Sequence, residues 1–259
     1  MRKALVVFEK EWLELRLQRG LLLATLVLPP ILTFFALTAF GLAALTPGNV
    51  STGGLPLPPD LVGLSSRELA QALVGKQFSV IFFFLPVFIP SVIASYAIVG
   101  EKRDRTLEPL LATPIRTSQL LLGKALAALV PSVVVTFVCA LLFVIGVELW
   151  SVTPRVARAV VTPGWAAVLV VDMPLLALIG VALIVIVSSR VNDPRTAQQV
   201  SAVLIVPMMG VLFGQLSGVL VLNVPFALLG ALALGFVAFV ALRLATDLFA
   251  REAILTRWR

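Results

Sequence analysis

The chain has 259 residues, and it contains no histidine, one cysteine and one tyrosine. Without histidine, the sequence excludes histidine-based acid–base catalysis, a haem ligand and a histidine-ligated zinc site. Cys139 is the single cysteine and lies in an apolar run, so no disulfide forms within the chain and we expect a buried thiol. The pattern Gly-x-x-x-x-Gly-Lys-Ser/Thr is also absent, which excludes ATP binding by a phosphate loop. We expect no catalytic residue, bound cofactor or metal site in this chain.

Charge is scarce as well, since 13% of the residues are charged whereas an ordinary soluble domain has about 25%. Hydrophobic residues make up 60% of the chain, which is more than one soluble core could bury. The segments without any charge are 20–59, 77–100, 125–147, 173–189 and 196–242. A helix needs about 20 apolar residues to cross a bilayer, so four of these segments are long enough and the last could hold two helices.

We therefore predict an all-α membrane protein with six transmembrane helices in a single domain over residues 1–259. The predicted spans are 21–45, 78–99, 125–147, 166–187, 201–221 and 225–244. The fourth span contains Asp172 and Pro174 near its start. We favour a helix that begins later, with Asp172 as its cap at the outer interface. The alternative is that Asp172 lies within the membrane and takes part in proton or cation coupling.

The net charge of +7 could indicate a nucleic-acid partner, but its distribution points to membrane topology instead. Sixteen of the twenty lysines and arginines fall on one side of the predicted spans, and the other four are Arg67, Lys76, Arg155 and Arg158. Basic residues concentrate in cytoplasmic segments of membrane proteins. We therefore expect both termini in the cytoplasm and no nucleic-acid partner.

Two segments outside the spans are expected to be helical. Near the N-terminus, an apolar face (Leu5, Phe8, Trp12 and Leu15) lies opposite a polar one (Lys10, Glu11, Glu14 and Gln18). This pattern predicts an N-terminal interfacial helix on the cytoplasmic membrane surface, and the alternative is a charged lead-in that only anchors topology. In the first external loop, residues 64–76 favour a short helix with Ser65 or Ser66 as its N-cap.

The most informative segment is the loop between the second and third spans, which combines dense charge of both signs with apolar residues. Leu107, Leu110 and Leu111 have the spacing of one face of a short helix. Such a helix could dock into a groove of another protein, or it could rest on anionic lipid. The interspersed acidic residues slightly favour a protein partner.

Residues 101–115 read Glu-Lys-Arg-Asp-Arg-Thr-Leu-Glu-Pro-Leu-Leu-Ala-Thr-Pro-Ile and are followed by Gly123-Lys124. This sequence resembles the first cytoplasmic loop of ABC-2 type transporter permeases, the membrane subunits of ABC exporters. Those loops usually read Glu-(Arg/Lys)-Glu-x-(Gly/Arg)-Thr-Leu-Glu-x-Leu-Leu-x-(Thr/Ser)-Pro, with Gly-Lys at the third span. Residues 188–199 and 248–255 are similar to later segments of the same family.

The resemblance implies a permease that exports a substrate, in a dimer of identical or related protomers, with ATP and magnesium bound by separate ATPase subunits. The loop would be the coupling helix that docks on the ATPase. The coupling residues it implies are Glu101, Arg103, Arg105, Thr106, Leu107, Glu108, Leu110, Leu111 and Pro114. Arg103 and Arg105 make this loop more basic than the family pattern, so we expect an acidic ATPase surface. The implied location is the plasma (inner) membrane of a prokaryote.

Two residues of the fifth span, Gln215 and Ser217, could line a substrate path between protomers, although helix packing is the favoured role. Gly210, Gly214 and Gly218 form a close-packing ridge that suits either a dimer contact or an intrachain contact. The alternative functions are a secondary transporter without an ATPase, an intramembrane enzyme and a membrane scaffold. A single doubtful intramembrane acid and the absence of histidine disfavour the transporter and enzyme alternatives.

Overall fold

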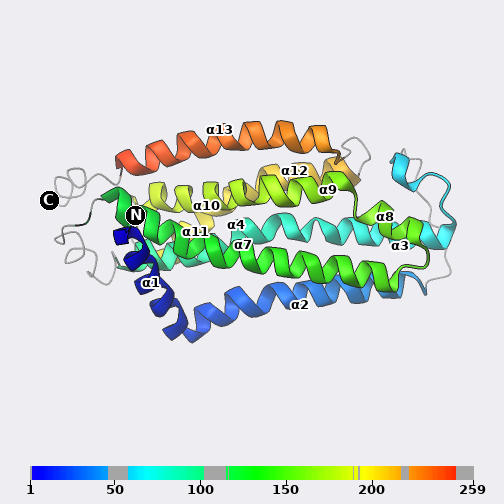
Figure 1. The fold of residues 1–259 in the computed structure, drawn as a ribbon, viewed down its shortest axis with the longest axis horizontal. Coiled ribbons are helices and arrows are strands. Elements are labelled where there is room, and N and C mark those ends of the chain that lie inside the picture. The colour runs from blue at the N-terminus through cyan, green and yellow to red at the C-terminus, as the bar shows by residue number, and fades with distance from the viewer. Residues whose placement is uncertain are drawn as a thin grey trace.

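The computed structural model describes residues 2–45, 58–101, 115, 117–188, 190–191, 193–216 and 222–248. In this part of the chain the regular structure is helical, and the long helices lie side by side along the longest axis (Figure 1). Six helical segments are long and apolar enough to cross a membrane, which confirms the predicted fold class. The end of α13 and the short helix α1 lie at the same end of this bundle (Figure 1).

Helix α1 (Arg2–Leu17) lies across that end of the bundle and leads directly into α2 (Arg19–Ala43). Its position on the membrane surface stays a prediction, but the predicted helix is present. Its buried residues are Ala4, Val7, Glu11 and Leu15, whereas Leu5 is 53% exposed. Glu11, which the sequence places on the polar face, is buried because it pairs with a lysine of another helix.

Helices α3 (Ser66–Ser79) and α4 (Ile81–Ala94) and the π-helix η2 (Ser95–Gly100) form a nearly continuous segment. Ser65 caps α3 by accepting a hydrogen bond from the Glu68 amide, and the Glu68 side chain accepts one from the Ser65 amide. This reciprocal capping box stabilises the first turn. The helix predicted over residues 64–76 and its Ser65 N-cap are confirmed, and its external location stays a prediction.

The third span belongs to α7 (Thr117–Trp150), which extends beyond both predicted ends. The next helices are α8 (Pro154–Val160), α9 (Pro163–Ala167), the π-helix η3 (Val168–Asp172) and α10 (Met173–Ser188). Thr162 caps α9 by accepting a hydrogen bond from the Trp165 amide, so the fourth span starts at Pro163. The expectation that Asp172 caps a late-starting helix is therefore wrong.

The fifth span consists of α11 (Pro194–Ser201), the 3-10 turn η4 (Ala202–Leu204) and α12 (Ile205–Leu216). The sixth span is α13 (Val224–Leu248). The fifth span begins seven residues before its predicted start at 201. Asp193 accepts a hydrogen bond from the Thr196 amide, and Pro194 occupies the first turn. An acidic cap followed by proline is a helix start, which the apolar pattern alone did not reveal.

The core centres on α4, because 78% of the apolar stretch of the span that contains it is buried inside the bundle. For the α13 span this share is 17%. Phe82, Phe143 and Trp165 meet with ring centroids 5.0–6.4 Å apart and join α4, α7 and α9. The Trp165 indole also donates a 3.2 Å hydrogen bond to the Ser79 carbonyl oxygen. Cys139 is buried and free, as expected.

Candidate functional site

Most residues of the predicted coupling loop lie outside the described part of the chain. The described residues around this segment are Glu101, which follows η2, and Ile115, which precedes α7. The predicted residues outside the described ranges are Arg103, Arg105, Thr106, Leu107, Glu108, Leu110, Leu111 and Pro114 in the loop, and Ser217 in the fifth span. The site is therefore built from the residues that border this loop.

Lys124 of α7 lies at the centre of a buried group of charges beside the loop. Its ammonium lies 2.5 Å from Glu11 Oε1, 2.7 Å from Glu101 Oε2 and 2.8 Å from the Ala97 carbonyl oxygen. The Lys124 side chain has no exposed surface. The contacts with Glu11 and Ala97 are hydrogen bonds, and the contact with Glu101 Oε2 is an ion pair.

Lys10 of α1 completes this group, which we call the α1 ion cluster (Lys10, Glu11, Glu101 and Lys124). Its ammonium contacts Glu101 Oε1, and it lies 3.2 Å from Glu11 Oε1 and 3.0 Å from Glu14 Oε1. The cluster joins α1, the end of η2 and the start of α7. It balances two cations with two buried carboxylates, which limits the cost of burying them.

Carboxylate oxygens of Glu11, Glu14 and Glu101 lie within 4.8 Å of one another, which is close enough to hold a metal ion. Two lysine ammoniums already pair with these three carboxylates and offset two of their three negative charges. The donor set therefore fits an internal ion network rather than a metal site.

The environment shifts the pKa of three members of the cluster. Burial lowers the pKa of Lys10, but the hydrogen bond to Glu101 and the charges of Glu11 and Glu101 outweigh it and raise that pKa above 10.5. Burial raises the pKa of Glu11 above 4.5, and the attraction of Lys124 offsets only part of this effect. For Glu101, burial also raises the pKa, but the charge of Lys124 and the hydrogen bond from Lys10 outweigh it and lower the pKa.

Gly123 lets α1 approach α7 closely beside the cluster. A Cβ atom at this position would lie 2.6 Å from Val7 Cβ and 2.7 Å from the Ala4 carbonyl oxygen. Real Cβ atoms do not tolerate such contacts, so a larger residue would push α1 away. The Gly123-Lys124 pair thus supplies both the space and the charge that hold α1 in place.

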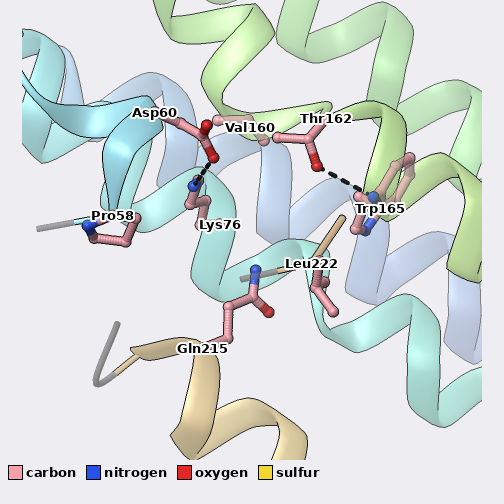
Figure 2. Close-up of a pocket in the computed structure, with 8 residues that line it drawn as sticks. All are labelled: Pro58, Asp60, Lys76, Val160, Thr162, Trp165, Gln215 and Leu222. Atoms are coloured by element: carbon pink, nitrogen blue, oxygen red, sulfur yellow. Dashed lines mark hydrogen bonds and ion pairs between the residues drawn. The ribbon is translucent and has the colours of Figure 1, made fainter. Parts of the chain in front are cut away.

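Gln215, the described residue of the predicted substrate path, lies near the opposite end of the bundle. It lines a small pocket with Asp60, Lys76 and Trp165, shown in Figure 2. Among the described residues, its buried Oε1 atom has no hydrogen-bond partner, whereas Lys76 and Asp60 pair at 3.1 Å. Gln215 lies in the last described turn of α12.

Asp172 is buried between helices, with 4% of its surface exposed, and its Oδ1 atom has no hydrogen-bond partner in the described part of the chain. Its Oδ2 atom lies 3.2 Å from the position that a Cβ would take on Gly230 of α13. Asp172 therefore faces the α13 backbone at a position where a side chain would crowd it. Carboxylates in such surroundings are rare and are candidates for function.

Reasoning from the sequence missed Lys10, Glu11 and Lys124 as site residues. Glu11 was assigned to the exposed face of an amphipathic helix, and Lys124 served only as part of a Gly-Lys motif. The available signal was a lysine at the edge of an otherwise uncharged run, together with acidic residues in the N-terminal helix. Glu11 and Lys124 pair across 113 residues, and the periodicity of a single helix gives no information about a contact so distant in sequence.

Comparison with known proteins gives one family. The family model described as ABC-2 family transporter protein matches residues 5–232, which is most of the chain. The match begins in α1 and extends into α13, so it includes all members of the α1 ion cluster. No curated protein matches the chain.

Proposed function

The chain belongs to the ABC-2 family of transporter proteins and is a membrane permease, and we propose that it couples ATP hydrolysis by a separate ATPase subunit to substrate export. The observation that carries the coupling proposal is how the loop joins the bundle. Glu101 is the first residue of the loop segment and contacts Lys124 of α7, which follows the loop. The loop therefore leaves and rejoins the bundle near one point, on the side with most of the basic residues.

In this proposal the loop docks in a cleft of the ATPase, and closure of the ATPase moves α4 and α7. The residues that would contact the ATPase are Glu101, Arg103, Arg105, Thr106, Leu107, Glu108, Leu110, Leu111 and Pro114. ATP and magnesium would bind to the ATPase, since the sequence has no phosphate loop. The loop side, and with it both termini, would face the cytoplasm of a prokaryotic cell.

The test is purification of the permease from its native membrane with identification of the bound ATPase. Glu108→Arg should lower ATP turnover by the complex, because it reverses a charge in the docking loop. Glu148→Arg is the matched control, since Glu148 is exposed at the far end of α7. A wild-type complex without any ATPase would refute the proposal, as would equal turnover for Glu108→Arg and Glu148→Arg.

We also propose that two protomers pair, with α12 at the contact. Gly210 of α12 is exposed, and among the described residues a Cβ there would meet nothing within 4 Å, so no described segment packs on this part of the glycine ridge. In a Cys139→Ala background, Gly210→Cys should form a disulfide-linked dimer on oxidation. Gly235→Cys of α13 is the control, because its surroundings are equally open. Equal cross-linking of both variants would contradict a contact at α12.

Secondary transport has one observation in its favour, the buried and unpartnered Asp172 Oδ1. Buried acidic groups of this kind can couple transport to protons or cations. The same purification separates the two functions, because a secondary transporter would work in vesicles without ATP or an ATPase. ATP-dependent export that survives Asp172→Asn would remove the support for secondary transport.

A further inference from the structure

We propose that Lys124 is a positioning residue that latches α1 to both borders of the coupling loop, so that α1 and the loop move as one body. The inference rests on the proposed function and adds a residue-level route from the loop to the N-terminal helix. The latch consists of the α1 ion cluster together with the close contact at Gly123.

The geometry of Lys124 supports this role. Its ammonium binds α1 through Glu11, the first residue of the loop segment through Glu101, and the η2 backbone through the Ala97 carbonyl oxygen. With three acceptor oxygens within 2.8 Å and no exposed surface, the side chain is held in one orientation. Movement of any of the three partners therefore pulls on the other two.

The buried charges of the α1 ion cluster also indicate that the cluster fixes the position of α1 rather than simply stabilising the protein. A buried ion pair is often no more stabilising than apolar residues of similar volume, because desolvation offsets the attraction. Apolar side chains would hold α1 against α7 in several neighbouring registers. Charge pairs to Lys124 and Lys10 specify one register, and removal of either partner leaves an uncompensated charge.

Gly123 provides a second hold on α1 that does not depend on charge. The α1 backbone approaches α7 so closely that a Cβ on Gly123 would overlap the Ala4 carbonyl oxygen and Val7. On its other side, α1 exposes Leu5, Val6, Leu13 and Leu17 by 53–80%. The helix thus has one face held by the latch and another free to contact lipid or a partner.

The first experiment measures ATP turnover by the purified permease–ATPase complex in lipid nanodiscs. Lys124→Met should lower kcat by about tenfold, the size of a typical coupling between sites, with the KM for ATP and the amount of bound ATPase unchanged. Arg158→Met is the control, since it also removes one positive charge but lies at an exposed position of α8, outside both the α1 ion cluster and the Gln215 pocket. Its kcat should stay near that of the wild type.

The second experiment moves α1 without changing any charge. Gly123→Val should lower kcat as Lys124→Met does, because the added side chain separates α1 from α7. Gly235→Val in α13 should have little effect, since a Cβ there meets nothing within 4 Å. The double variant Glu11→Gln/Lys124→Met should lose no more activity than Lys124→Met alone, because Glu11 pairs with Lys124 and both changes break the same latch.

Each result bears on the proposal in a distinct way. If no ATPase copurifies with the wild type, the proposed function fails. If the ATPase stays bound and Lys124→Met and Gly123→Val keep wild-type kcat, the latch is refuted and the proposed function stands. If these variants do not reach the membrane, Lys10→Met decides, since Lys10 is partly exposed. A lower kcat in Lys10→Met supports the latch, and an unchanged kcat refutes it.

Discussion

Gln71 and Trp150 are joined across 79 sequence positions by a 2.9 Å hydrogen bond from Gln71 Nε2 to the Trp150 carbonyl oxygen. The Gln71 side chain has no exposed surface, and its Oε1 atom accepts a 2.9 Å hydrogen bond from the Val152 amide. Trp150 is the last residue of α7, where helical carbonyl groups lack partners within the helix. One buried amide therefore fastens α3 to the end of α7, opposite the α1 end of the bundle (Figure 1).

Replacement of this amide should destabilise the bundle. In Gln71→Leu, the Val152 amide and the Trp150 carbonyl group lose their partners, at a cost of about 1–3 kcal/mol for each buried group. We expect a lower midpoint of thermal unfolding in detergent. Gln77→Leu is the matched control, because Gln77 is exposed on the same helix. Equal midpoints for the two variants would show that the hydrogen bonds of Gln71 contribute no net stability.

A second prediction concerns the contact between α9 and the residues before α13. A Cβ on Gly164 would overlap the backbone of Leu222, which a rotamer change cannot relieve. We expect Gly164→Ala to destabilise the protein by about 1–3 kcal/mol, the usual cost of overpacking. Gly235→Ala should leave the thermal midpoint nearly unchanged, since its surroundings are open. A stable Gly164→Ala variant would mean that this contact is loose in the membrane.

A third prediction concerns the carboxyl group of Asp172. Asparagine has nearly the same shape but carries no charge, and burial of an unpaired charge is costly. At pH 8 we expect Asp172→Asn to unfold at a higher temperature than the wild type. Asp247→Asn, at an exposed position of α13, should change the midpoint little. A less stable Asp172→Asn variant would indicate that a cation or another protomer pairs with the carboxylate.

A fourth prediction concerns the pH range over which Lys10 and Glu101 hold α1. The pKa of Lys10 is raised, so its contribution to stability is complete below its ordinary pKa of 10.5 and is lost as the pH rises through the higher folded value. The pKa of Glu101 is lowered, so its contribution is complete above 4.5 and is lost as the pH falls through the lower folded value. Glu11 responds in the opposite sense, because burial raises its pKa.

The measurement therefore uses a Glu11→Gln background, which removes the opposing group. In that background, the midpoint difference caused by Lys10→Met should be constant from about pH 5.5 to pH 9.5 and should shrink outside this range. Thermal unfolding across the pH series provides the check. A difference that changes steadily within the range would reveal another titrating partner of Lys10.

The sequence alone was sufficient to predict the number of spans and several helix starts. Uncharged runs indicate where the spans lie, because a charged side chain is costly inside a bilayer. Ser65 with Glu68 predicted the start of α3, since capping involves neighbours in sequence. The start of the fifth span was missed by seven residues, although Asp193 and Pro194 carried a local signal. The loop motif indicated the family, and the family match confirms it.

The tertiary structure alone decided which charges are buried together. Glu11 packs inward because Lys124, 113 residues later, supplies its partner. Asp172 lies inside a helix because Thr162 caps that helix ten residues earlier, and Gly230 of α13 leaves room for its carboxyl group. Helical periodicity records only neighbours along one helix, whereas burial of a charge depends on which side chain another helix presents. The sequence therefore determined the spans and the family, and packing between helices determined the ion cluster beside the loop.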